Sequence, residues 1–171
     1  MKLWHKSVVA LAVTSTLLTS CGGKSDEAAV SAPELVETQA PTVTTGFGAP
    51  LDLGNGLSVT FSTPEHFIPG KYASNYTKGQ LANKFSVTIK NGGTKELDPT
   101  TIIIASNAGG KNCVDVLDGD AGIEGAPADM IKAGASITFE YGVACSAKVG
   151  DPLNLSVSLG SALVAVDGKL A

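Results

Sequence analysis

Arginine is absent from this sequence of 171 residues, and all twelve of its basic side chains are lysines. Aromatic residues make up only 5% of the chain, and the formal net charge is −4. Proteins that bind nucleic acid through phosphate contacts need clustered cations, preferably arginine. Forked recognition of phosphate or carboxylate groups also depends on arginine. The composition therefore excludes nucleic acid as a partner and argues against an arginine-based anion site.

The apolar run near the N-terminus is too short to cross a bilayer as a helix. It covers residues 7–18 (SVVALAVTSTLL), about a dozen positions, whereas a hydrocarbon core of ~30 Å needs about 20. Lys2 and Lys6 precede it, and the tetrapeptide LTSC at residues 18–21 follows it. A positive segment, a short apolar segment and small residues before a cleavage point are typical of a secretory signal peptide. We expect residues 1–20 to be such a peptide.

The tetrapeptide that ends in Cys21 resembles the lipobox of bacterial lipoproteins. In that family the cysteine thiol receives a diacylglycerol, and the chain is cut just before the cysteine. The resemblance implies lipidation of Cys21 and a membrane partner reached through this anchor. Two or more acyl chains hold a soluble domain stably at a membrane, whereas one chain does not. The alternatives are an ordinary secreted protein with a chance cysteine and an uncleaved signal anchor.

Residues 21–46 predict a lipidated cysteine followed by a disordered tether. The segment is rich in Gly, Ser, Ala, Pro, Thr and Glu, and it has neither helical nor alternating periodicity. Such a composition buries too little apolar surface to offset the entropy lost on ordering. The alternative is a short amphipathic helix over residues 26–38, against which Pro33 and Pro41 count. We therefore expect one folded domain at residues 47–171.

Four segments of this domain alternate apolar and polar residues, which is the pattern of half-buried antiparallel strands. They cover residues 57–62, 85–90, 137–143 and 153–159, and shorter runs at 101–105, 113–117 and 162–166 also predict strands. Turn residues separate them at Asn55-Gly56, Asn91-Gly92-Gly93, Gly109-Gly110, Asp118-Gly119, Gly134 and Asp167-Gly168. About 7–8 strands with this spacing predict an all-β fold, an immunoglobulin-like antiparallel β-sandwich.

Two stretches of the domain carry a resemblance to a known family. Residues 84–99 (KFSVTIKNGGTKELDP) combine a strand with an Asn-Gly turn, and residues 131–157 join two alternating strands through Gly150-Asp151-Pro152. Together they resemble the Ig-like extracytoplasmic lipoproteins of Gram-positive, especially actinobacterial, bacteria, which are grouped with the mycobacterial immunoprotective extracellular antigen. The resemblance spans residues 54–170. It implies the fold and a surface location, with no established enzymatic role and no catalytic residues to transfer.

If Cys21 is lipidated, Cys113 and Cys145 remain as an even pair in an oxidising compartment. We expect a structural disulfide between them. Their spacing lacks the Cys-x-x-Cys pattern of redox sites. The alternatives are a redox role and two free thiols.

Five acids lie close together in the segment 115–129 (DVLDGDAGIEGAPAD): Asp115, Asp118, Asp120, Glu124 and Asp129. Oxygen ligands at short spacing suggest a weak divalent-cation site such as Ca²⁺ prefers. The EF-hand pattern is absent, so the alternative is a solvated acidic loop. We expect no resident metal or other cofactor, and residues 107–112 (NAGGKN) predict a hairpin rather than a phosphate loop.

The longest non-periodic stretch inside the domain covers residues 66–80 (HFIPGKYASNYTKGQ). It contains His66, Phe67, Tyr72 and Tyr76, and loop tyrosines on rigid sandwiches often make binding contacts. The alternative is a crossover whose aromatic rings fold back on the core. The sequence contains no Gly-x-Ser-x-Gly motif that would supply a nucleophilic serine for His66 to activate. We therefore expect no enzyme.

The sequence thus predicts a membrane-anchored lipoprotein on the extracytoplasmic face, acting as a binding or accessory module. An envelope protein or a cell-wall ligand would be its partner. The alternative is an envelope protein that binds a divalent cation through residues 115–129.

Overall fold

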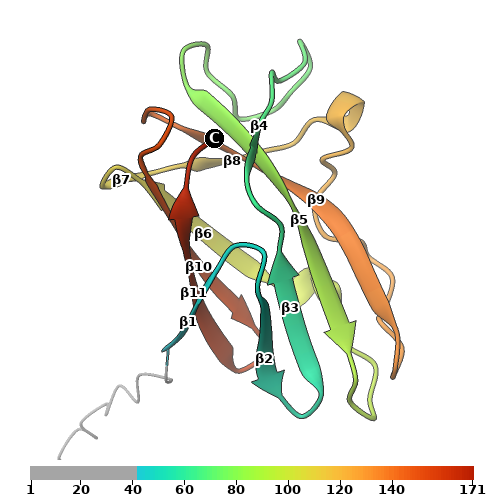
Figure 1. Cartoon of the computed structure of the whole chain (residues 1–171). Helices are drawn as coiled ribbons and strands as arrows, with labels where there is room; N and C mark the ends of the chain where they lie inside the picture. Colours follow the sequence, from blue (N-terminus) through green and yellow to red (C-terminus); the bar gives the residue numbers. More distant parts are fainter. Residues whose placement is uncertain (1–41) are drawn as a thin grey trace, which may run out of the picture. The chain divides into compact units, whose positions relative to one another are not determined.

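The computed structural model describes residues 42–171, which form two β-sheets that face each other (Figure 1). The first sheet contains, in spatial order, β1 (Thr42–Gly46), β11 (Ala162–Lys169), β10 (Pro152–Leu159), β6 (Ile103–Ala108) and β7 (Lys111–Asn112). The second contains β2 (Pro50–Gly54), β3 (Leu57–Phe61), β5 (Leu81–Asn91), β9 (Ser136–Cys145) and β8 (Val114–Val116), with β4 (Glu65–His66) paired to β5. Short 3₁₀ turns occur at Pro99–Thr101 (η1) and Gly119–Ala121 (η2). The predicted all-β sandwich is confirmed.

The alternating pattern of the sequence places one face of each strand in the core. On β10, for example, Leu153, Leu155 and Val157 are buried while the residues between them face solvent. The Phe85 ring lies at the centre of the core, where it packs edge-on against Phe47 and Phe61, with ring centroids 5.5 and 6.2 Å apart. Edge-to-face packing of this kind is the arrangement that aromatic quadrupoles favour.

The first described strand corrects the predicted end of the tether. The sequence predicts an unstructured segment as far as residue 46, but Thr42–Gly46 form β1, which pairs in parallel with β11. Strand β11 is bonded to β10 on its other side, so its free backbone groups offer an edge for another strand. Four of the five residues of β1 (TVTTG) are β-branched, and β-branched residues favour strands. Cys21 and the rest of the predicted tether lie outside the described residues.

One predicted turn is also wrong. Asp167-Gly168 lies inside β11, where Gly168 pairs with Leu153 of β10. The Phe47 ring occupies the place that a side chain at position 168 would take. The glycine therefore serves close packing of an aromatic ring against a strand. The turn between β10 and β11 lies at Gly160, whose φ is 61°.

Within residues 42–171 no helix has the length and apolar character needed to cross a membrane.

Candidate functional site

An apolar recess opens on the side of the sandwich where β6 and β9 lie next to the short edge strands β7 and β8. Strand β7 covers β6 only at Asn107 and Ala108, and β8 covers β9 only from Gly142 to Ala144. The opening beyond these short strands has a volume of about 310 Å³. It is lined by Ile102, Ile103, Ile104, Asp115, Val116, Leu117, Ile123, Gly125, Ala126, Phe139 and Tyr141. A concave, mainly apolar site with a few polar groups is the usual form of a ligand pocket.

Tyr141 spans this recess from β9 to β6. Its hydroxyl donates a hydrogen bond to the backbone oxygen of Ile104 at 3.4 Å, and its ring lies 5.6 Å from that of Phe85. Burial, followed by a hydrogen bond to Asp115 and the charge of that carboxylate, raises the pKa of the Tyr141 phenol. The hydroxyl is therefore protonated at neutral pH, where it serves as a hydrogen-bond donor.

The surface beside the recess is apolar as well. The side chain of Ile103 is 66% exposed and that of Leu117 is 47% exposed, and both line the opening. Single exposed apolar residues are common, but these two flank the same apolar recess. The sequence does not predict this surface, because Ile103 lies in a run (residues 101–105) that predicts only a strand.

Acidic residues line the recess and the hollows next to it. Asp115 lines it and also lines a neighbouring depression that contains Ser106 and Cys113. A second neighbouring depression shares Phe139 with the recess and is lined by Glu124 and Glu140. No lysine lines any of these three hollows. We call these three hollows, which share lining residues, the side groove: the central recess is mainly apolar, and acids line the hollows next to it.

The predicted disulfide between Cys113 and Cys145 is confirmed, with Cα atoms 4.4 Å apart. Cys113 follows β7 in one sheet, and its backbone N–H donates to the oxygen of Ser106 on β6. Cys145 ends β9 in the other sheet. The bond therefore ties the two sheets together at the point where the chain crosses between them, and Cys113 lines one hollow of the side groove.

The predicted binding loop divides into two parts. Phe67 and Tyr76 fold back and pack on a small cluster of Ala82, Val116 and Ala144, as the alternative interpretation expects. Tyr72 instead is 77% exposed, with the Lys71 Nζ 4.5 Å from its ring centroid.

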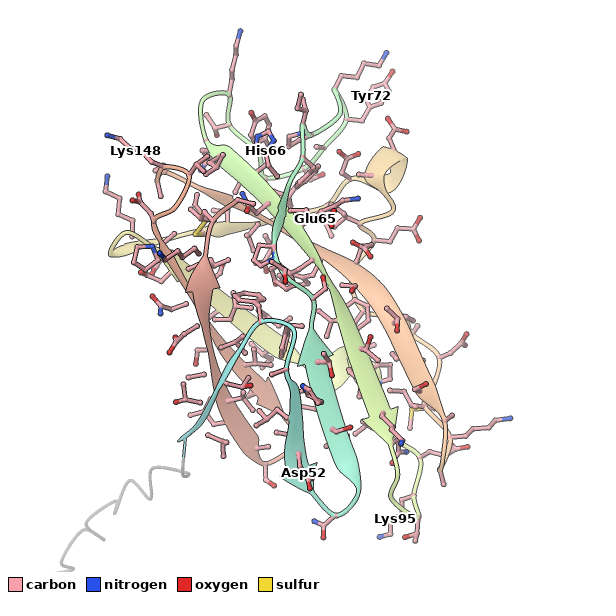
Figure 2. The ribbon with its side chains drawn as sticks, viewed as in Figure 1. Asp52, Glu65, His66, Tyr72, Lys95 and Lys148 are labelled. Atoms are coloured by element: carbon pink, nitrogen blue, oxygen red, sulfur yellow. A yellow bond between two sulfur atoms is a disulfide. The ribbon has the colours of Figure 1, made fainter. Side chains whose placement is uncertain are left out.

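His66 is exposed and pairs with Asn83 of β5. Figure 2 shows His66 and Tyr72 at the same end of the domain as Lys148, away from Asp52 and Lys95. Because Phe67 and Tyr76 pack inward while Tyr72 faces solvent, the four predicted loop residues do not form one binding surface.

The structure does not gather the acids of residues 115–129 into one cluster of three or more. Among residues 42–171, no three His, Cys, Asp or Glu side chains are grouped so that they could hold a metal ion. Asp118 is 4% exposed, and its carboxylate accepts a hydrogen bond from the backbone N–H of Gly70 at 2.7 Å. This acid therefore has a structural partner, which also corrects the picture of a fully solvated acidic loop.

Another depression, which is open and has a volume of about 770 Å³, lies outside the side groove. Its lining includes Lys78, Lys111 and Lys148. The single acid that lines it, Asp151, accepts a hydrogen bond from the backbone N–H of Lys148 at 2.8 Å. Three lysines of the domain therefore line a hollow that is separate from those of the side groove.

Comparison with known proteins identifies similar folds. One solved structure is that of YcdA, a presumed lipoprotein of Bacillus subtilis, with 18% identity and a TM-score of 0.54. The match covers 67% of this chain and 37% of the Bacillus chain. Another is an uncharacterised β-sandwich protein of Clostridium difficile, with 15% identity, a TM-score of 0.48 and coverage of 78% and 99%. No protein-family model matches the sequence, and a search of curated proteins finds no match.

Proposed function

We propose that this chain is a lipid-anchored protein of the extracytoplasmic face of the cell membrane. We further propose that its sandwich is a binding module without catalytic activity, with the apolar recess between β6 and β9 as the ligand site. The signal-like segment that ends in Cys21 supports the anchor. A protein of similar fold, the Bacillus one, carries the description of presumed lipoprotein, which agrees with it.

The recess is the observation that carries the binding role. Apolar side chains from both sheets converge on it, and the Tyr141 hydroxyl and Asp115 carboxylate supply the polar groups. Rigid sandwich strands hold these groups, which favours a preformed site over one assembled on binding. The recess lies between the two sheets at one side of the sandwich, so a ligand in it would contact both sheets.

Lipidation is tested by growing cells that express the full chain with an alkyne analogue of palmitate. We expect the wild-type protein to take up the label and to sediment with membranes. A Cys21→Ala variant should lose both properties, because it lacks the thiol that the acyl chains would modify. A Cys113→Ala/Cys145→Ala variant is the matched control and should keep the label. Membrane retention of the Cys21→Ala variant would contradict the anchor.

Binding at the recess is tested by placing a photo-crosslinking amino acid at Ile103 in the full chain on intact cells. We expect a discrete crosslinked product that disappears when Ala126→Trp fills the recess. The same crosslinker at Val43, which is 45% exposed on β1, is the control. Identical diffuse products from both positions would count against the recess as a binding site.

A further inference from the structure

We infer that the side groove binds an extended peptide segment that adds to the open edge of β6. The segment places one large apolar side chain in the recess and a lysine or arginine on each side of it. This inference rests on the proposed binding function and names the class of partner.

The backbone of β6 has a free edge beside the recess. Neighbouring residues in a strand direct their N–H and C=O groups to opposite edges, so residues two apart share an edge. The Ser106 oxygen accepts from the N–H of Cys113, which identifies this edge as the one facing β7. Ile104, two residues earlier, therefore directs its N–H and C=O to this same edge. Its backbone oxygen accepts only the 3.4 Å hydrogen bond from the Tyr141 hydroxyl. No other strand of residues 42–171 pairs there.

A peptide strand on this edge would pair with Ile104 and lie over the recess. Strand addition of this kind uses main-chain hydrogen bonds for affinity and pockets for alternate side chains for specificity. The recess is such a pocket, since its apolar lining comes from both sheets. Exposed Ile103 and Leu117 would be covered by the added strand.

A buried hydroxyl provides a further, independent sign of a missing partner. The Ser106 Oγ atom is buried and has no hydrogen-bond partner among the described residues. Ser106 lines the hollow next to the recess. Buried polar atoms in folded proteins are nearly always satisfied, so each exception calls for an explanation. A polar group of a bound peptide would satisfy this one.

The charges of the side groove select the chemistry of the peptide. Asp115 lines the recess and one neighbouring hollow, and Glu124 and Glu140 line the other neighbouring hollow. Basic residues on both sides of the apolar anchor would meet these acids, and acidic ones would be repelled. The same repulsion disfavours a second copy of this chain, because a two-fold pairing of β6 edges would bring the acids of each copy together. It also disfavours an anionic lipid headgroup.

The test uses the purified full chain in detergent and a fluorescein-labelled peptide, Ser-Lys-Thr-Leu-Thr-Lys-Ser. In an extended peptide the leucine and both lysines share one face. We expect saturable binding by fluorescence anisotropy that weakens as salt is added. Replacement of both lysines by glutamate should weaken binding by at least roughly tenfold. Equal binding of the lysine and glutamate peptides would overturn the charge assignment.

Strand addition is tested by two peptides, one N-methylated at the leucine and the other at the following threonine. Only one of the two positions directs its N–H toward β6, so one methyl group should weaken binding by roughly tenfold and the other should not. Equal binding of the two peptides would overturn strand addition.

Two protein variants locate the site. Asp115→Lys should weaken binding of the lysine peptide and strengthen that of the glutamate peptide, with Asp129→Lys as its control. Ala126→Trp should abolish binding, with Ala147→Trp in the lysine-lined depression as its control. If wild type binds no peptide while crosslinking at Ile103 still depends on the recess, the peptide inference fails and the proposed function stands. If neither is seen, both fail.

Discussion

The carboxylate of Asp118 accepts a hydrogen bond from the backbone N–H of Gly70 at 2.7 Å, across 48 positions of sequence. A Cβ atom on Gly70 would lie only 3.3 Å from oxygens of both Asp118 and Asp120. The contact holds the 66–80 loop against the segment that follows β8. It explains why one acid of a hydrophilic stretch is buried.

We predict that Asp118→Ala lowers the free energy of unfolding by about 1.5–3 kcal/mol, because it leaves the Gly70 N–H without its charged acceptor. Urea denaturation followed by circular dichroism measures the effect. Asp120→Ala is the control, since Asp120 is exposed, and it should change stability by less than about 0.5 kcal/mol. An equal loss in the two variants would show that the acids act through general charge rather than through this hydrogen bond.

The disulfide should account for a large share of the stability of the domain. Cys113 and Cys145 are separated by 32 positions, and closing a loop of that length stabilises a fold by ~3–4 kcal/mol in the chain-entropy model. A Cys113→Ala/Cys145→Ala variant should therefore unfold at a much lower urea concentration than wild type. Wild type in the presence of a reductant should shift in the same direction. Unchanged midpoints would mean that the sheets hold together without the bond.

Tyr141 should make stability sensitive to high pH. Its pKa is raised from an ordinary value of 10.0, so the folded state favours the protonated phenol. The stabilisation is complete below pH 10 and is lost as the pH rises above that value, because the unfolded chain then releases the proton more easily. Between pH 10 and 12, wild type should lose more stability than Tyr141→Phe. The difference should stay below ~1.4 kcal/mol per pH unit, the limit for one proton, and solvent screening of the partly buried side chain reduces it further.

Urea titrations at several alkaline pH values measure this slope. Tyr72→Phe is the control, because Tyr72 is largely exposed, and it should follow wild type. Parallel pH curves for wild type and Tyr141→Phe would contradict the assigned environment of the phenol.

Gly168→Ala should be destabilising for a steric reason. The added methyl group would displace the Phe47 ring, which also packs against Phe85. Overfilling of a packed core costs about 1–3 kcal/mol. Gly46→Ala on the neighbouring strand is the matched control, since a Cβ there would meet only an oxygen of Asp167 at 3.9 Å. Thermal or urea unfolding compares the two variants, and equal stabilities would show that the Phe47 ring adjusts freely.

The alternation of apolar residues predicts the main strands because burial on one face of a sheet is a local, periodic property. The pairing of Cys113 with Cys145 was predictable for another reason, since setting Cys21 aside as the expected lipidation site leaves two cysteines and one pairing. The apolar recess was not predictable, because β6 and β9 bring Ile104 and Tyr141 together from distant parts of the chain. The same holds for Asp118, whose partner lies 48 positions away.

The start of the domain was misjudged because a short Thr- and Val-containing segment forms a strand only when a neighbouring edge is available. The glycine at position 168 was misjudged because Asp-Gly is a common turn pair. Its use in a strand depends on a ring that comes from Phe47, which is remote in sequence. Both errors arise from tertiary contacts that override local preference.

The parallel pairing of β1 with β11 has a mechanical consequence. Any pull on the chain before Thr42 enters the sandwich through β1, whose five residues are matched from Thr42 opposite Leu163 to Gly46 opposite Asp167. A load directed along the strand would act on these pairs together, in shear, instead of peeling them apart one at a time. The first strand of the domain would thus transmit a load applied at Thr42 to the disulfide-linked sheets.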